Sequence, residues 1–100
     1  MKLETNVAGV TFDGRQNILK SLYGKPVRAE LRLEPENKVN SLAVAVYLNG
    51  SKVGYIPDDI CDVVHDYIDR VDEVAAAVEC YEVYYVMLAI IFREDEDGDA

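Results

Sequence analysis

The sequence predicts a mainly β protein with two short helices, arranged as a small six-stranded β-barrel. Three observations support this fold class. One hundred residues make a single domain with one modest core, and half of them are apolar. Residues 27–33 alternate strictly between apolar and polar side chains. The dipeptide Asn49-Gly50 lies between two apolar runs, as in a tight β-hairpin.

The first predicted elements are a strand over residues 5–12 and a helix that follows it. Asp13, with Gln16 three residues later, fits a capping box at the start of this helix. Gly24 suits the position just after the helix ends. Residues 27–33 then form the clearest strand of the chain, with one apolar and one polar face.

A central hairpin follows. Pro35 ends the preceding strand because proline donates no backbone hydrogen bond. Residues 42–48 are apolar throughout, which is typical of a strand covered on both faces. Asn49-Gly50 accepts the positive φ angles of a type I′ turn, and residues 52–56 return alongside. We expect this hairpin to hold the loop over residues 35–41 rigidly at one end.

The second half of the chain predicts a helix and two closing strands. Asp58 or Asp59 is expected to cap the helix, whose apolar residues recur at helical spacing from Ile60 to Val71. Residues 74–81 and 84–93 predict the closing strands, with Glu82 near their turn. Six short strands with two helical plugs favour a barrel of the OB-like or SH3-like kind.

The domain is expected to span residues 1–93, followed by an acidic tail over residues 94–100. The net charge of −9, taken alone, argues against a nucleic-acid partner. The charge is unevenly distributed, however, because residues 1–57 carry a net +3 and residues 58–100 carry a net −12. The first half could therefore offer a basic face to a phosphate chain, or the acids could serve solubility alone.

The sequence offers little for catalysis or metal binding. Its single histidine, His65, is predicted to be a surface residue, and a Cys61–His65 nucleophile pair lacks a visible orienting partner. Cys61, Cys80 and His65 do not have the spacing of a zinc site, and the acids of the tail lack the final glutamate of a calcium loop. We expect no enzyme activity and no cofactor. Without a signal-peptide pattern, a cytoplasmic location is the default expectation.

Two motifs together resemble the signature of the HIRAN domain. The first is Glu34-Pro35, then the apolar residues 43–46, Gly50 and the segment 53–57 (Val-Gly-Tyr-Ile-Pro). The second is the run over residues 7–16, which is similar to that family's opening segment. The resemblance covers roughly residues 7–69. It implies a small β-barrel that binds DNA. In the best-understood members of the family, the bound part of the DNA is the 3′-hydroxyl end of a single strand.

The loop after Pro35 departs from the family pattern. That pattern usually has Asn-Pro-Tyr-Asp, whose Tyr and Asp are implied to grip the terminal nucleotide, whereas this chain has Asn37-Lys38-Val39-Asn40. Val39 cannot stack on a base, and Asn40 is not a charged acceptor. Losing one stacked aromatic ring weakens binding by about 1–3 kcal/mol, part of which Lys38 could recover through phosphate attraction.

These considerations give a set of candidate nucleic-acid-binding residues. The candidates are Arg15, Asn37, Lys38, Asn40, Lys52 and Tyr55. For Arg15 a surface position in the first turn of the helix is the alternative, and for Tyr55 it is packing in the core. Arg28 and Arg32 share a strand face with Glu30, so ion pairing is more expected there than phosphate contact.

Two functions therefore remain open. The first is a non-catalytic module that binds single-stranded DNA or DNA ends in replication or repair. The second is a protein-interaction or dimerisation module on the same fold with a degenerate DNA pocket. The missing Tyr and Asp of the loop, the acidic bias and the apolar closing strands support the second, since an exposed closing strand can pair with a second copy. Tyr81, Tyr84 and Tyr85 in the closing hairpin could form either a stacking surface or an association patch.

Overall fold

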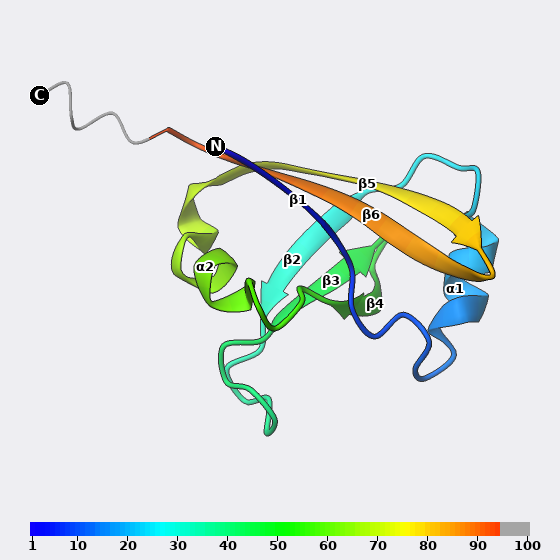
Figure 1. The fold of residues 1–100 in the computed structure, drawn as a ribbon, viewed down its shortest axis with the longest axis horizontal. Coiled ribbons are helices and arrows are strands. Elements are labelled where there is room, and N and C mark those ends of the chain that lie inside the picture. The colour runs from blue at the N-terminus through cyan, green and yellow to red at the C-terminus, as the bar shows by residue number, and fades with distance from the viewer. Residues whose placement is uncertain (95–100) are drawn as a thin grey trace, which may run out of the picture.

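Two three-stranded antiparallel sheets make up the fold in the computed structural model, which describes residues 1–94 (Figure 1). One sheet has the strand order β1-β6-β5 and the other has the order β2-β3-β4. The strands are β1 (Lys2–Asn6), β2 (Ala29–Leu33), β3 (Val44–Leu48), β4 (Ser51–Tyr55), β5 (Val71–Tyr81) and β6 (Val83–Phe92). The helices are α1 (Arg15–Leu22), α2 (Cys61–Asp66) and the short 3₁₀ helix η1 (Ile68–Arg70).

The mainly β class with two short α-helices is confirmed, but the closed six-stranded barrel is wrong for the described residues. A β-bridge at one residue pair joins the segment after β1 to β4: the Ala8 N–H donates to the Tyr55 carbonyl at 2.7 Å, and the Tyr55 N–H donates to the Ala8 carbonyl at 2.9 Å. Gly9 then turns the chain away with φ +77°. Because this contact is one residue long, it joins the sheets without closing a continuous ladder.

Gly54 makes this crossing possible. A Cβ atom at position 54 would lie 2.2 Å from the Ala8 carbonyl oxygen and 2.5 Å from Cγ1 of Val7. Both distances are far inside van der Waals contact, so no other residue fits while the two backbones lie this close. The glycine of the predicted return strand is therefore the point at which one sheet is held against the other.

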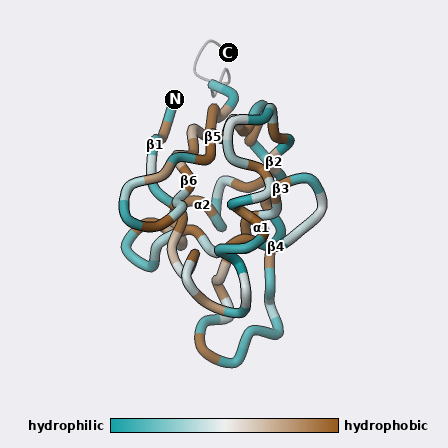
Figure 2. Tube along the Cα trace, turned by 90° about the vertical axis from the view of Figure 1, so that its right-hand side faces the viewer, coloured by the Kyte–Doolittle hydropathy of each residue, from teal (hydrophilic) through white to brown (hydrophobic). Residues whose placement is uncertain are grey.

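The core lies between the two sheets. β3 is almost fully covered, as its apolar sequence predicts, and only Tyr47 is partly exposed. β6 sends alternate residues inward, from Val86 to Phe92. Figure 2 shows hydrophobic residues gathered along these strands, whereas the loop at the bottom of the molecule is largely hydrophilic. The largest fully buried side chains are Leu19, Leu48, Ile56, Leu88, Ile90 and five valines.

Both predicted hairpins are present. Asn49 and Gly50 adopt φ of 50° and 87°, as a type I′ turn requires. β5 and β6 form the longer hairpin, and Glu82 makes its turn with φ 66°. β5 begins earlier than predicted, at Val71, because the apolar residues at the end of the helical stripe belong to the strand.

The start of the chain differs from the prediction. The first strand is Lys2–Asn6 rather than residues 5–12, because pairing with β6 sets its position. The Asp13–Gln16 capping box is also wrong. Gly14 occupies the N-cap position, and Asp13 has φ 56°, which does not allow capping geometry. The Gln16 amide instead joins α1 to β6, since it donates to the Tyr84 carbonyl at 2.7 Å and accepts from the Tyr84 N–H at 2.8 Å.

The second helix is shorter than predicted. It spans only six residues and has Ile60, not Asp58 or Asp59, at its N-cap, with no capping side chain. A 3₁₀ turn then leads into β5. Of the predicted tail, only Glu94 is described: it forms an ion pair with the N-terminal amine. The rest of the predicted tail, residues 95–100, lies outside the described residues.

Replacing Gly54 with alanine should destabilise the protein by about 3 kcal/mol or more, because the new Cβ forces the two backbones apart. Gly24→Ala is the control, since φ +78° strains alanine there but nothing lies within 4 Å of the new Cβ. That change should cost about 1–2 kcal/mol. Urea unfolding measures the free energy of unfolding of both variants. Equal losses of stability would show that the close contact between the two backbones at Gly54 does not exclude a Cβ atom.

Candidate nucleic-acid interface

The loop that follows β2 is held by its own asparagine side chains. The Asn37 Oδ1 accepts hydrogen bonds from the backbone N–H groups of Val39 and Asn40, at 2.9 and 3.0 Å. The Asn40 Oδ1 accepts from the Leu42 N–H at 2.9 Å. At the loop's base, the Glu34 N–H donates to the Ala43 carbonyl. Such bonds between asparagine and nearby backbone fix a turn, so the predicted rigid loop has a physical basis.

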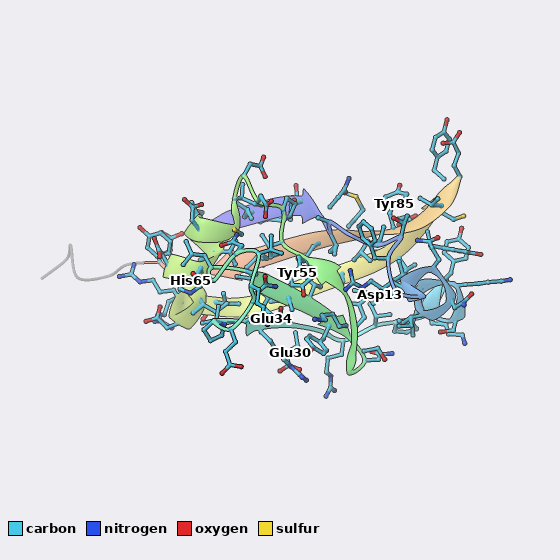
Figure 3. The ribbon with its side chains drawn as sticks, turned by 90° about the horizontal axis from the view of Figure 1, so that it is seen from below. Asp13, Glu30, Glu34, Tyr55, His65 and Tyr85 are labelled. Atoms are coloured by element: carbon cyan, nitrogen blue, oxygen red, sulfur yellow. The ribbon has the colours of Figure 1, made fainter. Side chains whose placement is uncertain are left out.

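Glu34 is the centre of a polar cluster beneath this loop. Its carboxylate accepts from Lys52 Nζ at 2.8 Å, from the Tyr55 hydroxyl at 2.9 Å and from Asn37 Nδ2 at 3.1 Å. Lys52 Nζ also donates to the Tyr55 hydroxyl, at 3.0 Å. Figure 3 shows Glu34 and Tyr55 close together in the middle of the underside of the molecule. The cluster thus ties the loop, β2 and β4 together.

The charges in this cluster stabilise each other. The hydrogen bond from Lys52, together with those from Asn37 and Tyr55, holds the pKa of Glu34 below its usual value. The hydrogen bond to Glu34 in turn raises the pKa of Lys52. Both side chains are partly buried, with exposed fractions of 23% and 32%. Lys52 is therefore a paired cation, and its charge is not available in full to a phosphate.

A pocket of about 370 Å³ opens between this loop and the turn after Ala8. This volume falls in the range of small-ligand sites, about 300–1,000 Å³. Phe12 and Val39 lie at its rim with 65% and 95% of their surface exposed. We call this the loop pocket. It is lined by Ala8, Gly9, Phe12, Asn37, Val39, Asn40, Ala43, Tyr55, Ile56, Pro57 and Asp58.

Three of the candidate residues line the loop pocket, and three do not. Asn37, Asn40 and Tyr55 are among its lining residues. Lys52 lies behind Tyr55, bound to Glu34. Lys38 is exposed beside the pocket, and no ion pair holds it within residues 1–94.

Arg15 is not the surface residue that its place in the first turn of α1 predicts. It is 8% exposed, its Nη1 donates to the Gly9 carbonyl at 2.8 Å, and its guanidinium lies 5.6 Å from the centre of the Tyr55 ring. Arg15 therefore holds the turn after Ala8 in place from behind. This position could not be predicted from helical spacing, which says nothing of a side chain that folds back under the preceding loop.

Phe12 and Asp58 are the lining residues that sequence reasoning missed as site residues. Phe12 was placed in a first strand with Val7 and Val10, where an aromatic side chain suggests core packing. It lies instead in the turn between Gly9 and Gly14, which both have positive φ. The pair of glycines around an aromatic residue is the signal that could have indicated an exposed ring.

Cys61 and His65 do not form a nucleophile pair. Cys61 is buried and its sulfur accepts a hydrogen bond from Asn40 Nδ2 at 3.3 Å, which ties the loop to α2. His65 is half-buried, contrary to the predicted surface position, and its Nδ1 has no hydrogen-bond partner within residues 1–94. In the described part of the chain, no three metal-ligating side chains are grouped, and no helix is long and apolar enough to span a bilayer.

The two-sheet fold and its rigid loop define a class of small β proteins with a preformed pocket between loops. The HIRAN domain family model matches residues 2–94, which is nearly the whole chain, so the chain belongs to the HIRAN domain family. HIRAN domains are DNA-binding modules and are generally non-catalytic. The match extends beyond the motifs over residues 7–69 and takes in the closing hairpin. No curated protein and no solved structure matches the chain.

Replacing Glu34 with glutamine should reduce the stability of the protein by about 1–3 kcal/mol near neutral pH, the value of a charge-assisted hydrogen bond. Because folding lowers the pKa of Glu34, its contribution is complete above the usual carboxyl value of 4.5 and is lost as the pH falls through the lowered pKa. The difference from the unchanged protein should therefore vanish in acid.

Thermal unfolding between pH 7 and pH 2.5 measures this difference. The matched control is Glu36→Gln, which removes an exposed acid two residues away and should change little. A constant difference over the whole range would contradict the role of the ionised Glu34.

Proposed function

We propose that this chain is a non-catalytic module that binds single-stranded DNA or DNA ends in replication or repair, and that the loop pocket holds one nucleotide. The observation that carries the proposal is the pocket itself, which has a volume of about 370 Å³ and is lined by two aromatic residues, Phe12 and Tyr55. Asn37 and Asn40 also line it, and each of their side-chain NH₂ groups uses only one of its two N–H donors in a hydrogen bond within residues 1–94. Flat rings for stacking and neutral groups for hydrogen bonding are what recognition of a single-stranded base requires.

The charges near the loop pocket favour weak binding. Lys52 is paired with Glu34, Arg15 is buried, and Asp58 lies in the lining of the pocket. Lys38 is the exposed cation beside it. Binding at this pocket should therefore depend mainly on stacking and only slightly on salt. Fluorescence anisotropy with a labelled four-nucleotide strand at low salt tests the proposal, and no binding of either free or blocked 3′ ends would reject it.

Replacing Phe12 with alanine should weaken binding of the four-nucleotide strand by about tenfold or more, since a stacked ring contributes about 1–3 kcal/mol. The ring is 65% exposed, so the loss should not come from unfolding. Phe12→Tyr keeps the flat ring and serves as control. Equal affinity of the alanine and tyrosine variants for the strand would show that the ring of Phe12 does not contribute to binding.

Restoring an aromatic residue in the loop should have the opposite effect. Val39 is 95% exposed at the rim of the pocket, so tyrosine fits there without repacking. Val39→Tyr should strengthen binding by about tenfold to a hundredfold, and Val39→Leu, which adds apolar surface without a ring, should not. If a free 3′ hydroxyl is the preferred end, the gain should be larger for that end than for a strand with a 3′ phosphate.

The second candidate function is self-association through the outer face of the β1-β6-β5 sheet. Ala75, Ala77 and Met87 are exposed on that face and line a shallow hollow of about 230 Å³. β5 is also an edge strand of its sheet. Sedimentation at increasing concentration tests this candidate: a dimer that Ala77→Glu converts to a monomer supports it, and a monomer throughout rejects it.

A further inference from the structure

The cations of this protein differ in whether an acid neutralises them. Within residues 1–94, an acid lies within 4.0 Å of the side chains of Lys2, Arg15, Arg32, Lys52 and Arg93. Four others, Lys20, Lys25, Arg28 and Lys38, form no side-chain ion pair or hydrogen bond within residues 1–94. Three of these four lie within nine residues of each other, from Lys20 to Arg28.

The sequence around these three cations contains no acid. Between Asp13 and Glu30 there is no Asp or Glu, although the whole chain carries 19 of them. Arg15, at the start of this stretch, is paired with Asp13, but the three cations from Lys20 to Arg28 have no acid between them in the sequence and no ion pair within residues 1–94. The location of these three cations is one end of the molecule, at the C-terminal end of α1 and the start of β2 (Figure 1).

An exposed tyrosine lies among these cations. Tyr23 directly follows α1, is 48% exposed, and packs edge to face on Tyr84 with 5.5 Å between ring centres. Tyr84 belongs to β6, so the ring of Tyr23 is held in place by the sheet. A fixed, half-exposed ring between Lys20 and Lys25 provides the combination of stacking surface and cation that binds single strands without sequence preference.

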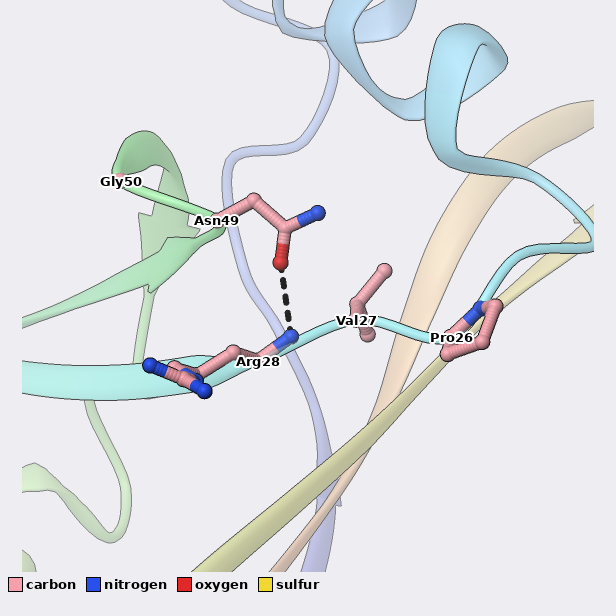
Figure 4. Close-up of a pocket in the computed structure, with 5 residues that line it drawn as sticks. All are labelled: Pro26, Val27, Arg28, Asn49 and Gly50. Carbon is pink, nitrogen blue, oxygen red and sulfur yellow. Dashed lines mark hydrogen bonds between the residues drawn. The ribbon is translucent and has the colours of Figure 1, made fainter.

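Arg28 extends the same surface toward the β3–β4 turn. Its backbone N–H donates to Asn49 Oδ1 at 2.7 Å across an open hollow of about 630 Å³ lined by Pro26, Val27, Arg28, Asn49 and Gly50 (Figure 4). Three extended residues span at most about 11 Å, so Lys25 and Arg28 stay within reach of neighbouring phosphates on one strand. We call Lys20, Tyr23, Lys25 and Arg28 the basic end.

We propose that the basic end is a second nucleic-acid contact surface, which binds the phosphate backbone of a single strand whose other part occupies the loop pocket. This inference rests on the function proposed above and adds a separate site to it. In this proposal the loop pocket contacts bases and has little unpaired positive charge. The basic end has three unpaired cations and one aromatic ring on which a base can stack. Glu82, in the β5–β6 turn near α1, carries the opposite charge and weakens this attraction.

Other roles for these residues make different predictions. Lys20 lies in the last turn of α1, where a cation interacts favourably with the helix dipole and so stabilises the helix. That role predicts a loss of stability and no change in nucleic-acid binding. A role at an anionic membrane predicts binding to lipid vesicles and no preference for a strand.

The test compares two triple variants that remove the same charge. Lys20→Gln, Lys25→Gln and Arg28→Gln together remove the unpaired cations of the basic end. Lys2→Gln, Arg32→Gln and Arg93→Gln together remove three exposed cations that are already paired with acids. Both variants have the same net charge, so a general effect of charge should appear equally in both.

The strands used are single-stranded DNA of 4 and 16 nucleotides. Even at the 3.4 Å phosphate spacing of a duplex strand, 16 nucleotides span about 50 Å, comparable to the 49 Å length of the molecule. Four nucleotides span about 14 Å at that spacing and are expected to fill the loop pocket alone. Anisotropy is measured between 25 and about 200 mM salt.

The basic-end variant should bind the 16-nucleotide strand about tenfold more weakly at low salt, and the slope of log affinity against log salt should fall by about 2, since each phosphate contact contributes about 0.7. Binding of the 4-nucleotide strand should be unchanged. The paired-cation variant should behave as the unchanged protein with both strands.

The outcomes separate this inference from the proposed function. If the 4-nucleotide strand binds but the two triple variants do not differ on the longer strand, the basic end is rejected and the loop pocket stands. If neither strand binds, the proposed function fails and the basic end fails with it. If the basic-end variant loses only its binding to vesicles containing phosphatidylserine, the surface serves a membrane and the inference is overturned.

Discussion

The close backbone contact between Ala8 and Tyr55 is the constraint on which the rest of this structure depends. It joins the two sheets through a pair of hydrogen bonds of 2.7 and 2.9 Å, and it exists because Gly54 has no side chain. The same contact brings Tyr55 beneath the loop and sends the chain into the turn that carries Phe12. The fold and the loop pocket therefore have one origin, since the residues that fix the sheets also line the pocket.

Much of the fold could be predicted from the sequence, because those parts are specified by local chemistry. Alternation over residues 27–33 and the Asn49-Gly50 turn each determine a strand or hairpin without help from distant residues. The arrangement of the sheets could not be predicted. Whether six strands close into a barrel depends on how two distant segments meet, and here they meet through the single residue Ala8.

The candidate site was predicted in part for the same reason. Asn37 and Tyr55 match the pattern that resembles the HIRAN domain, Asn40 stands in the same loop where the pattern has an acid, and all three line the loop pocket. Two of the charged candidates are not free to contact a phosphate as predicted, because Lys52 is paired with Glu34 and Arg15 is buried. A sequence gives the number of cations but not their partners. Glu34 is identified as the centre of the cluster only in three dimensions, where it accepts hydrogen bonds from Asn37 of the loop and from Lys52 and Tyr55 of β4.

The distribution of paired charge explains how so acidic a chain can belong to a DNA-binding family. Affinity for a phosphate chain depends on cations that a strand can reach and that no acid already neutralises, rather than on net charge. Asp62 and Asp66 lie on α2, and Asp72, Glu73 and Glu79 lie on β5, while residues 14–29 contain no acid at all. In the proposals above, base contact falls to the loop pocket and phosphate contact to the separate cations of the basic end. In such an arrangement, substitutions in the loop can change which end is recognised without changing the attraction for the strand as a whole.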